Sequence, residues 1–311
     1  MHLTFDWNTT LRRVRQRTAF VPAGSGGASC RGEWKRFPYG DRVYRFGGDA
    51  LAGNWARLHR GDCEPYPDAG GLAGLLDANP ALATQVGDPA ATAGLLQSAW
   101  RAYHAGDFAE AADQGQAAGV VGTVVAVRAA LVHATYLEES ETRRAAILRE
   151  AVEACGALVE LAPNWANAWF VNGLALGRYC QHVPLVRTLA QGLGGKARDS
   201  LNRAIRLEPA HADAHVGLGI YGADVIDKVG AMVAALTYGV RREHVLAHFE
   251  AARTLHPQSP MVCVEYARAL LRIGGGGDAA RAHGLYADAL ACSPADAQER
   301  LDVEWARAEL A

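Results

Sequence analysis

Histidines at helical spacing are the residues of this sequence whose types could bind a metal. His211 and His215 are four residues apart, as are His244 and His248, so that one turn of helix would place each pair on one face. No carboxylate or cysteine completes a ligand set beside them, and the chain has no Cys-x-x-Cys pair. We therefore expect no metal site, and the alternative place for these histidines is the core between helices.

Other chemical motifs are incomplete. The segment QGLGGKA around Lys196 has the glycines and the lysine of a phosphate-binding loop, but it lacks the first glycine at the required spacing and the Ser or Thr after the lysine. No Ser-His-Asp or Cys-His arrangement can be read from spacing, because the partners of such a site meet only in the folded chain. The sequence therefore predicts neither an enzyme nor a cofactor.

Composition points to an ordinary soluble chain. Half of the 311 residues are hydrophobic and 21% are charged, and the formal net charge of −2 gives no general attraction to nucleic acid or to a membrane. From the sequence, we expect no segment to be apolar for long enough to span a bilayer, and no apolar signal core follows the basic residues at the start. We expect no membrane span, no nucleic-acid partner and a cytoplasmic location.

A recurring pattern organises the chain from about residue 92 onward. Four segments end alike, at Pro163, Pro209, Pro257 and Pro294, with Leu or Cys two residues before each proline. Three of them also carry an alanine five residues before the proline, at Ala204, Ala252 and Ala289. Because proline lacks an N–H but fits the first turn of a helix, each of these prolines is expected to end one helix and open the next.

The residues between the prolines match a known repeat. The first halves carry Trp169, Asn172, Gly173 and Leu176, then His215, Leu218, Gly219 and Gly222, then Cys263, Tyr266, Ala267 and Leu270; the second halves carry Ala197, Leu201 and Ala204, then Val245, Phe249 and Ala252, then Ala282, Tyr286 and Ala289. Over residues 92–294 this resembles the tetratricopeptide-repeat (TPR) superfamily, with degenerate repeats. The resemblance implies an all-α, right-handed solenoid of antiparallel helix pairs.

Two regions are distinguished by composition. Residues 1–90 are predicted to form a basic arm, rich in glycine, proline and aromatic residues, with at most short helices. Residues 91–311 are predicted to form the solenoid, with five helix pairs and a capping helix over 296–311. Five large residues are expected to be largely buried between its helices: Trp169, Leu218, Phe249, Tyr286 and Trp305.

The spacing of the prolines departs from the template. Two repeats measure 46 and 48 residues from proline to proline, whereas a plain TPR has 34. The extra residues fall between the first and second helix of the pair, at 177–196 and 223–242, and both inserts are rich in apolar residues. Long connections with their own apolar pattern commonly pack as lids or cover a cavity, and we expect extended connections of this kind here.

The resemblance also identifies candidate binding residues. In TPR proteins generally, fixed positions of the first helix line the concave groove, and here they include Phe170, Val171, Leu174, Val216, Ile220, Glu265 and Arg268. The lysine, asparagine and arginine of the family's carboxylate clamp are absent, so the groove should suit an apolar occupant. Tyr179, Tyr221, Asp224 and Lys228 are expected at the rim of this groove, although a surface salt bridge is an alternative role for Asp224 and Lys228.

Two functions of this groove remain open. The first is a non-enzymatic scaffold that binds an unidentified protein segment in the groove. The second is a binding protein for a small apolar or aromatic ligand in a pocket covered by the two inserts, similar in idea to the TPR component of some TRAP-type transporters. The side chains of the inserts could equally fill the groove themselves.

Overall fold

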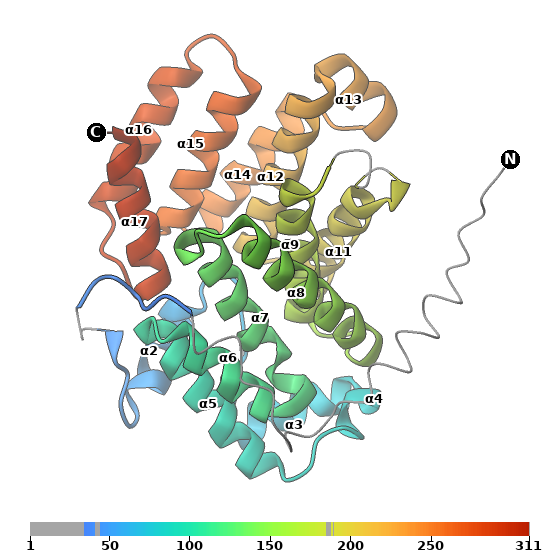
Figure 1. Ribbon diagram of the computed structural model, residues 1–311, viewed down its shortest axis with the longest axis vertical. Helices are drawn as coiled ribbons and strands as arrows, with labels where there is room; N and C mark the ends of the chain where they lie inside the picture. Colours follow the sequence, from blue (N-terminus) through green and yellow to red (C-terminus); the bar gives the residue numbers. More distant parts are fainter. Residues whose placement is uncertain (1–33, 41–43, 185–187, 189, 311) are drawn as a thin grey trace, which may run out of the picture. The chain divides into compact units, whose positions relative to one another are not determined.

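The computed structural model describes residues 34–40, 44–184, 188 and 190–310, and this part of the chain contains helices and no strand (Figure 1). The short N-terminal helices are α2 (Ala50–Leu58), α3 (Ala69–Ala78) and α4 (Pro80–Ala83). The helices that follow are α5 (Pro89–Ala105), α6 (Phe108–Ala117), η3 (Gly119–Gly122), α7 (Thr123–Val132), η4 (His133–Leu137), α8 (Glu141–Leu161), α9 (Ala166–His182), α11 (Leu193–Leu207), α12 (Ala212–Val229), α13 (Ala231–Tyr238), α14 (Arg242–Leu255), α15 (Pro260–Ile273), α16 (Asp278–Ala291) and α17 (Ala297–Leu310). The predicted all-α class is confirmed.

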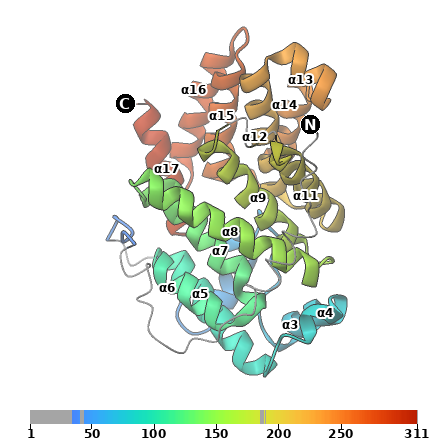
Figure 2. The same cartoon turned by 45° about the vertical axis from the view of Figure 1, so that its right-hand side comes forward.

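The long helices pack as successive pairs. The pairs are α5 with α6, α7 with α8, α9 with α11, α12 with α14, and α15 with α16, and α17 follows against the last pair (Figure 2). Each first helix also packs beside the first helix of a neighbouring pair, which is how a repeat buries the apolar face that it cannot bury alone. The predicted order of five pairs and a cap is therefore present in the residues described.

The repeat prolines occupy a slightly different position from the one predicted. Pro163, Pro209 and Pro257 lie in the turn between two helices, a few residues before the next helix begins. The N-cap positions fall to other residues: the His211 ring accepts a hydrogen bond from the backbone N–H of Ala214, and Ser259 does the same for Val262. The prolines thus end one helix, but side chains further along open the next.

Small residues allow the two helices of a pair to approach closely, as the repeat pattern predicts. A Cβ atom at Gly219 would lie 2.5 Å from the Phe249 ring, and one at Gly173 would lie 2.7 Å from the Leu201 side chain. Both distances are too short for carbon atoms that are not bonded. Glycine at these two positions is therefore required by the packing of α12 on α14 and of α9 on α11.

The predicted core residues divide into two groups. Leu218, Phe249 and Tyr286 are buried, as expected. Trp169 and Trp305 are partly buried, and each is more exposed than the other three. The indole N–H of each tryptophan makes an exposed hydrogen bond: that of Trp169 donates to the carbonyl of Pro163 in the preceding turn, and that of Trp305 donates to Glu309, one turn later on α17.

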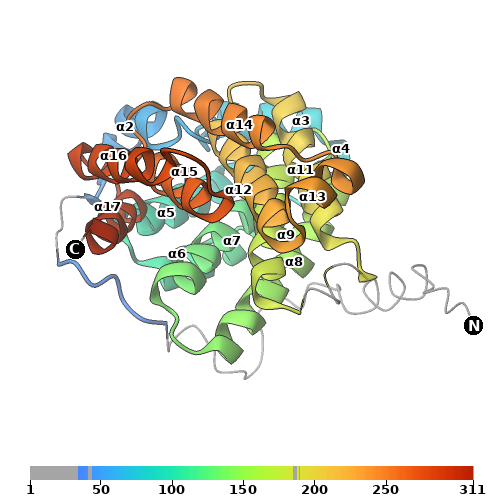
Figure 3. The same cartoon turned by 90° about the horizontal axis from the view of Figure 1, so that it is seen from above.

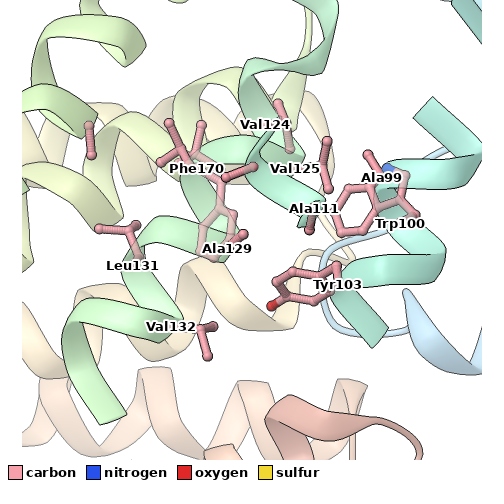
Figure 4. Packing of buried hydrophobic residues seen from close by; sticks show 14 of the residues in the cluster. Ala99, Trp100, Tyr103, Ala111, Val124, Val125, Ala129, Leu131, Val132 and Phe170 are labelled. Atoms are coloured by element: carbon pink, nitrogen blue, oxygen red, sulfur yellow. The ribbon is translucent and has the colours of Figure 1, made fainter. Parts of the chain in front are cut away.

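The largest buried aromatic residues belong to α5 instead. Trp100 and Tyr103 are almost completely buried, between α2 on one side and α7 on the other (Figure 4). The Trp100 ring makes edge contacts with Trp55 and Tyr103 at centroid distances of 5.9 and 5.3 Å, and it stacks on His104. This aromatic cluster joins the N-terminal helices to the first repeat.

One helical stretch is longer and more apolar than expected from the sequence. Gly119–Leu137 is long and apolar enough to cross a bilayer, although no such segment was expected. Of its apolar window, 61% is buried inside the fold, because α7 packs against α5, α6, α8 and α9. Residues 1–33 and 41–43 of the predicted N-terminal arm lie outside the described residues. The described part of the arm contains α2, α3 and α4.

Candidate functional site

The part of the predicted groove that α9 and α12 form is covered by a segment of this chain, residues 59–64, which we call the covering segment. The backbone carbonyl of Gly61, just after α2, accepts a hydrogen bond of 2.9 Å from the backbone N–H of Asp213. The carbonyl of Asp62 accepts another, also of 2.9 Å, from the Asn167 side chain. A Cβ atom at Gly61 would overlap the Asp213 carboxylate, so only glycine permits this approach.

Three of the predicted groove residues are therefore inaccessible. Phe170, Val171 and Val216 are all at least 97% buried. The ring of Phe170 packs against the His211 ring, at a centroid distance of 4.6 Å, and lies beneath the Arg128 guanidinium. These residues form core in this chain rather than an open apolar groove.

A buried polar network holds the covering segment in place. The ring of His59 lies between Asp62, at 2.9 Å, and His104, whose Nε2 atom is 3.3 Å from that of His59. The other nitrogen of His104 lies 2.8 Å from the Asp296 carboxylate, at the start of α17. Arg128 of α7 forms an ion pair with Asp62 in the same network. The network therefore connects α2, α5, α7 and α17.

Burial and neighbouring charges shift the pKa values of the acidic groups here in opposite directions. Burial opposes ionisation of Asp62, but His59 and Arg128 outweigh it and hold the pKa of Asp62 well below its usual range. Burial, reinforced by the charge of Asp62, raises the pKa of Glu64 to about 8. Burial also raises the pKa of Asp213 to about 7, although Arg128 opposes this rise. Of these three carboxyl groups, Asp62 is thus the one that ionises most readily.

The stability of the fold is expected to fall as the pH rises from about 6.5 to 8. Burial raises the pKa of four carboxyl groups, Glu64, Asp213, Glu299 and Asp302, so the folded chain retains protons that the unfolded chain has released. Burial lowers the pKa of His133, His211, His248 and His256 to about 4, and these opposing groups act only below their unfolded value near 6.5.

Urea unfolding at a series of pH values measures this dependence. The matched variant is Glu64→Gln, which keeps an acceptor for the Asn167 amide, 2.5 Å away, but cannot ionise. This variant should show a shallower decline above pH 6.5 than the native chain. A free energy of unfolding that rises between pH 6.5 and 8 would contradict the assignment.

The C-terminal groove residues are engaged in ion pairs. Glu265 of α15 is buried and accepts a hydrogen bond of 2.9 Å from Arg178 of α9. Arg268 lies 3.8 Å from the same carboxylate, and its guanidinium lies 4.6 Å from the centre of the Trp305 ring. Both candidate residues therefore stabilise contacts among α9, α15 and α17.

A cavity of about 350 Å³ lies where the two inserts begin. It is enclosed by the C-terminal halves of α9 and α12, the N-terminal half of α11 and one residue of α13. Of the predicted site residues, it brings together Leu174, Ile220, Tyr221, Asp224 and Lys228. Tyr179 is not among the lining residues. Much of the remaining wall lies in the two inserts, 177–196 and 223–242, and includes Cys180, Thr188, Val225, Val229 and Tyr238, which the sequence analysis did not name individually. Leu201 of α11 also lines the cavity.

Glycines are what leave this space open. Gly177, in the middle of α9, and Gly195, in the first turn of α11, line the cavity, and a Cβ atom at either would meet no other atom within 4 Å. Lining residues on α12 recur every three or four positions, from Gly217 to Val229, so a single face of that helix forms one wall. A larger residue at Gly177 would project into the cavity without displacing the protein.

The polar groups at the cavity differ in whether they have partners. Asp224 accepts a hydrogen bond of 2.9 Å from Gln181 and forms an ion pair with Arg272 of α15. The surface salt bridge considered for Asp224 and Lys228 is therefore absent, because the Asp224 carboxylate is directed to α15. Lys228 makes no ion pair with any residue that the structure describes.

The second insert places a short helix beside the cavity. α13 is bounded by Gly230 and Gly239, whose φ angles of 80° and 65° lie in the left-handed region that glycine tolerates best. Tyr238 of α13 reaches the cavity wall. On the opposite side of the helix, Met232 and Leu236 are 76% and 82% exposed.

The histidines singled out in the sequence are divided by the fold. His211 is used as the N-cap of α12, whereas His215 lies with its Nδ1 atom 3.0 Å from that of His248 on α14. In the part of the chain that the structure describes, no three histidine, cysteine or acidic side chains gather as a metal site would require.

Comparisons with known proteins bear on the fold. No protein-family model matches the sequence, and no curated protein matches it. Among solved structures, the chain is similar to a thermophilic TPR protein of Thermus thermophilus, with a TM-score of 0.50 and 20% sequence identity. The likeness covers 70% of this chain and 99% of that chain. At this identity it concerns the fold alone.

Proposed function

We propose that this chain, which has a TPR-like helical-repeat fold, is a non-enzymatic binding protein that holds an apolar ligand in the cavity between α9, α11 and α12. The fold supports a binding role in general, because helical repeats act by presenting surfaces to other molecules. The observation that carries the proposal is the cavity of about 350 Å³, within the size range of ligand sites, with apolar walls and a few convergent polar groups.

The concave groove is a poorer candidate. Its first part is covered by residues 59–64, and Glu265 at its other end is already paired with Arg178. A ligand there would have to displace buried hydrogen bonds, each of which is costly to break. The cavity requires no such displacement, because its glycine-lined walls leave room.

A second candidate function, the binding of a partner protein segment, is supported by the outer face of α13. Met232 and Leu236 are highly exposed apolar side chains beside the cavity. A partner segment lying across α13 would bury them. Replacing both by aspartate should then abolish binding of the partner while leaving small-molecule binding in the cavity unchanged.

Filling the cavity tests the first proposal. We expect Gly177→Met to abolish the thermal stabilisation that a screen of small apolar acids, aromatics and lipids produces in the native chain. A ligand present at a hundred times its dissociation constant stabilises the fold by about 2.7 kcal/mol, which a thermal-shift assay detects readily. The substitution should not harm the fold, since glycine inside a helix is about 0.5–1 kcal/mol worse than alanine.

Gly284→Met is the matched control. Gly284 also lies inside a helix, α16, and a Cβ atom there would meet nothing within 4 Å, but it is exposed and far from the cavity walls. This control should retain every hit. If no compound stabilises the native chain, or if Gly177→Met keeps the same hits, the cavity is not a ligand site.

A further inference from the structure

We infer that the ligand of this cavity is an amphiphilic acid, with its apolar chain between α9, α11 and α12 and its anionic head group beside Lys228. This inference rests on the proposed function and specifies the chemical class of the ligand. The chain would lie along Leu174, Leu201 and Ile220, which line the apolar part of the cavity.

The charges that line the cavity are unequal. Three cations, Arg178, Arg198 and Lys228, accompany one carboxylate, that of Asp224. Asp224 is paired with Arg272, and two of the three cations are paired as well, which leaves Lys228 as the charged group of the wall without an ion pair among the described residues. An apolar ligand with a negative group therefore complements this surface better than a neutral or a cationic ligand does.

Lys228 differs from the other two cations. Arg178 is paired with Glu265 at 2.9 Å, and Arg198 with its neighbour Asp199 at 2.8 Å. Lys228 has no such partner among the residues described, and it lies at the exposed end of α12, where the cavity meets solvent. A head group placed there keeps contact with water while the chain is buried, which is the arrangement that an amphiphile needs.

One further side chain of the cavity suits an anion. Thr188 is 92% buried and lines the cavity, and its hydroxyl makes no hydrogen bond with a described residue, although the Cys180 thiol lies nearby. Thr188, Cys180 and Lys228 all line the cavity. The Thr188 hydroxyl can donate to a carboxylate oxygen.

The start of α11 faces the same space. Gly192, Gly194 and Gly195 line the cavity, and no side chain caps the first turn of this helix. Its first backbone N–H groups have no partner within the helix, and the positive end of the helix dipole favours an anion. The absence of Cβ atoms lets a ligand approach this backbone closely.

Calorimetry with matched ten-carbon probes, below their micelle concentrations, tests the inference. We expect decanoate to bind at least tenfold more tightly than decanol at pH 7.4 and low ionic strength, and decylammonium to bind most weakly. Lys228→Gln should bring the decanoate affinity close to that of decanol and leave the decanol affinity unchanged. Arg149→Gln, which removes an exposed cation of α8 that does not line the cavity, should change neither.

The outcomes separate the inference from the proposed function. If decanol and decanoate bind equally and Lys228→Gln has no effect, the cavity binds apolar ligands but the anionic head group is wrong. Tightest binding of decylammonium overturns the inference in the same way. If none of the three probes binds, the proposed function itself fails.

Discussion

Trp100→Ala is expected to lower the free energy of unfolding by about 3–5 kcal/mol, which is the usual effect of removing a fully buried large aromatic side chain. Trp100 is only 2% exposed and contacts Trp55, Tyr103 and His104, and the Arg128 guanidinium lies 5.9 Å from its ring centre. Its loss would leave a large cavity between α2, α5 and α7. Urea unfolding followed by circular dichroism measures the change.

Trp169→Ala is the matched control for this experiment. It removes the same side chain from a partly buried position, where the indole ring packs against the edge of the core and its N–H donates to the carbonyl of Pro163. We expect a loss of about 1 kcal/mol, typical of a partly exposed site. Equal losses for the two variants would show that Trp100 is not the centre of the core.

Arg128→Met should have an effect of similar size, about 3–5 kcal/mol, because removing one member of a buried ion pair leaves the other charge without compensation. Arg128 is paired with the buried carboxylate of Asp62 and lies 3.8 Å from that of Asp213. Methionine retains much of the length and the apolar contact of the arginine chain, so the loss reports mainly on the charge.

Adding Asp62→Asn provides the test of that explanation. In the double variant no carboxylate is left uncompensated at Asp62, so the double variant should be more stable than Arg128→Met alone. Arg149→Met, at an exposed position of α8, should change the stability by less than about 0.5 kcal/mol. A double variant that is less stable than Arg128→Met would mean that Asp62 stabilises the fold through its other hydrogen bonds.

The repeat architecture could be predicted because its signals are local. A glycine at Gly173 or Gly219 reports directly on the helix packed against it, and the proline spacing marks where helices end. The burial of Trp169 is less complete than that of Leu218, Phe249 and Tyr286 for a related reason. The pattern gives a position within a repeat, but whether a neighbouring element covers that position depends on the rest of the chain.

The covering segment and its network could not be found in this way. His59 meets His104, and His104 meets Asp296, across separations of 45 and 192 residues that follow no period. The cavity could be predicted in part from the sequence, because its α12 wall is a helical stripe that begins in the repeat and continues into the second insert. The lack of an ion pair at Lys228 could not be predicted from the sequence, because Asp224 pairs instead with Arg272 of another repeat.

The contact between the last helix and the first repeat gives the array a fixed length. α17 packs against α5 as well as against α15 and α16, and the bond between His104 and Asp296 joins the two (Figure 3). An open solenoid can gain or lose a whole unit and keep every remaining interface. In this chain, deleting or duplicating one helix pair would move Asp296 away from His104 and break the contact between α17 and α5. We therefore expect related chains to keep the same number of repeats and to differ by substitutions and by the lengths of their loops.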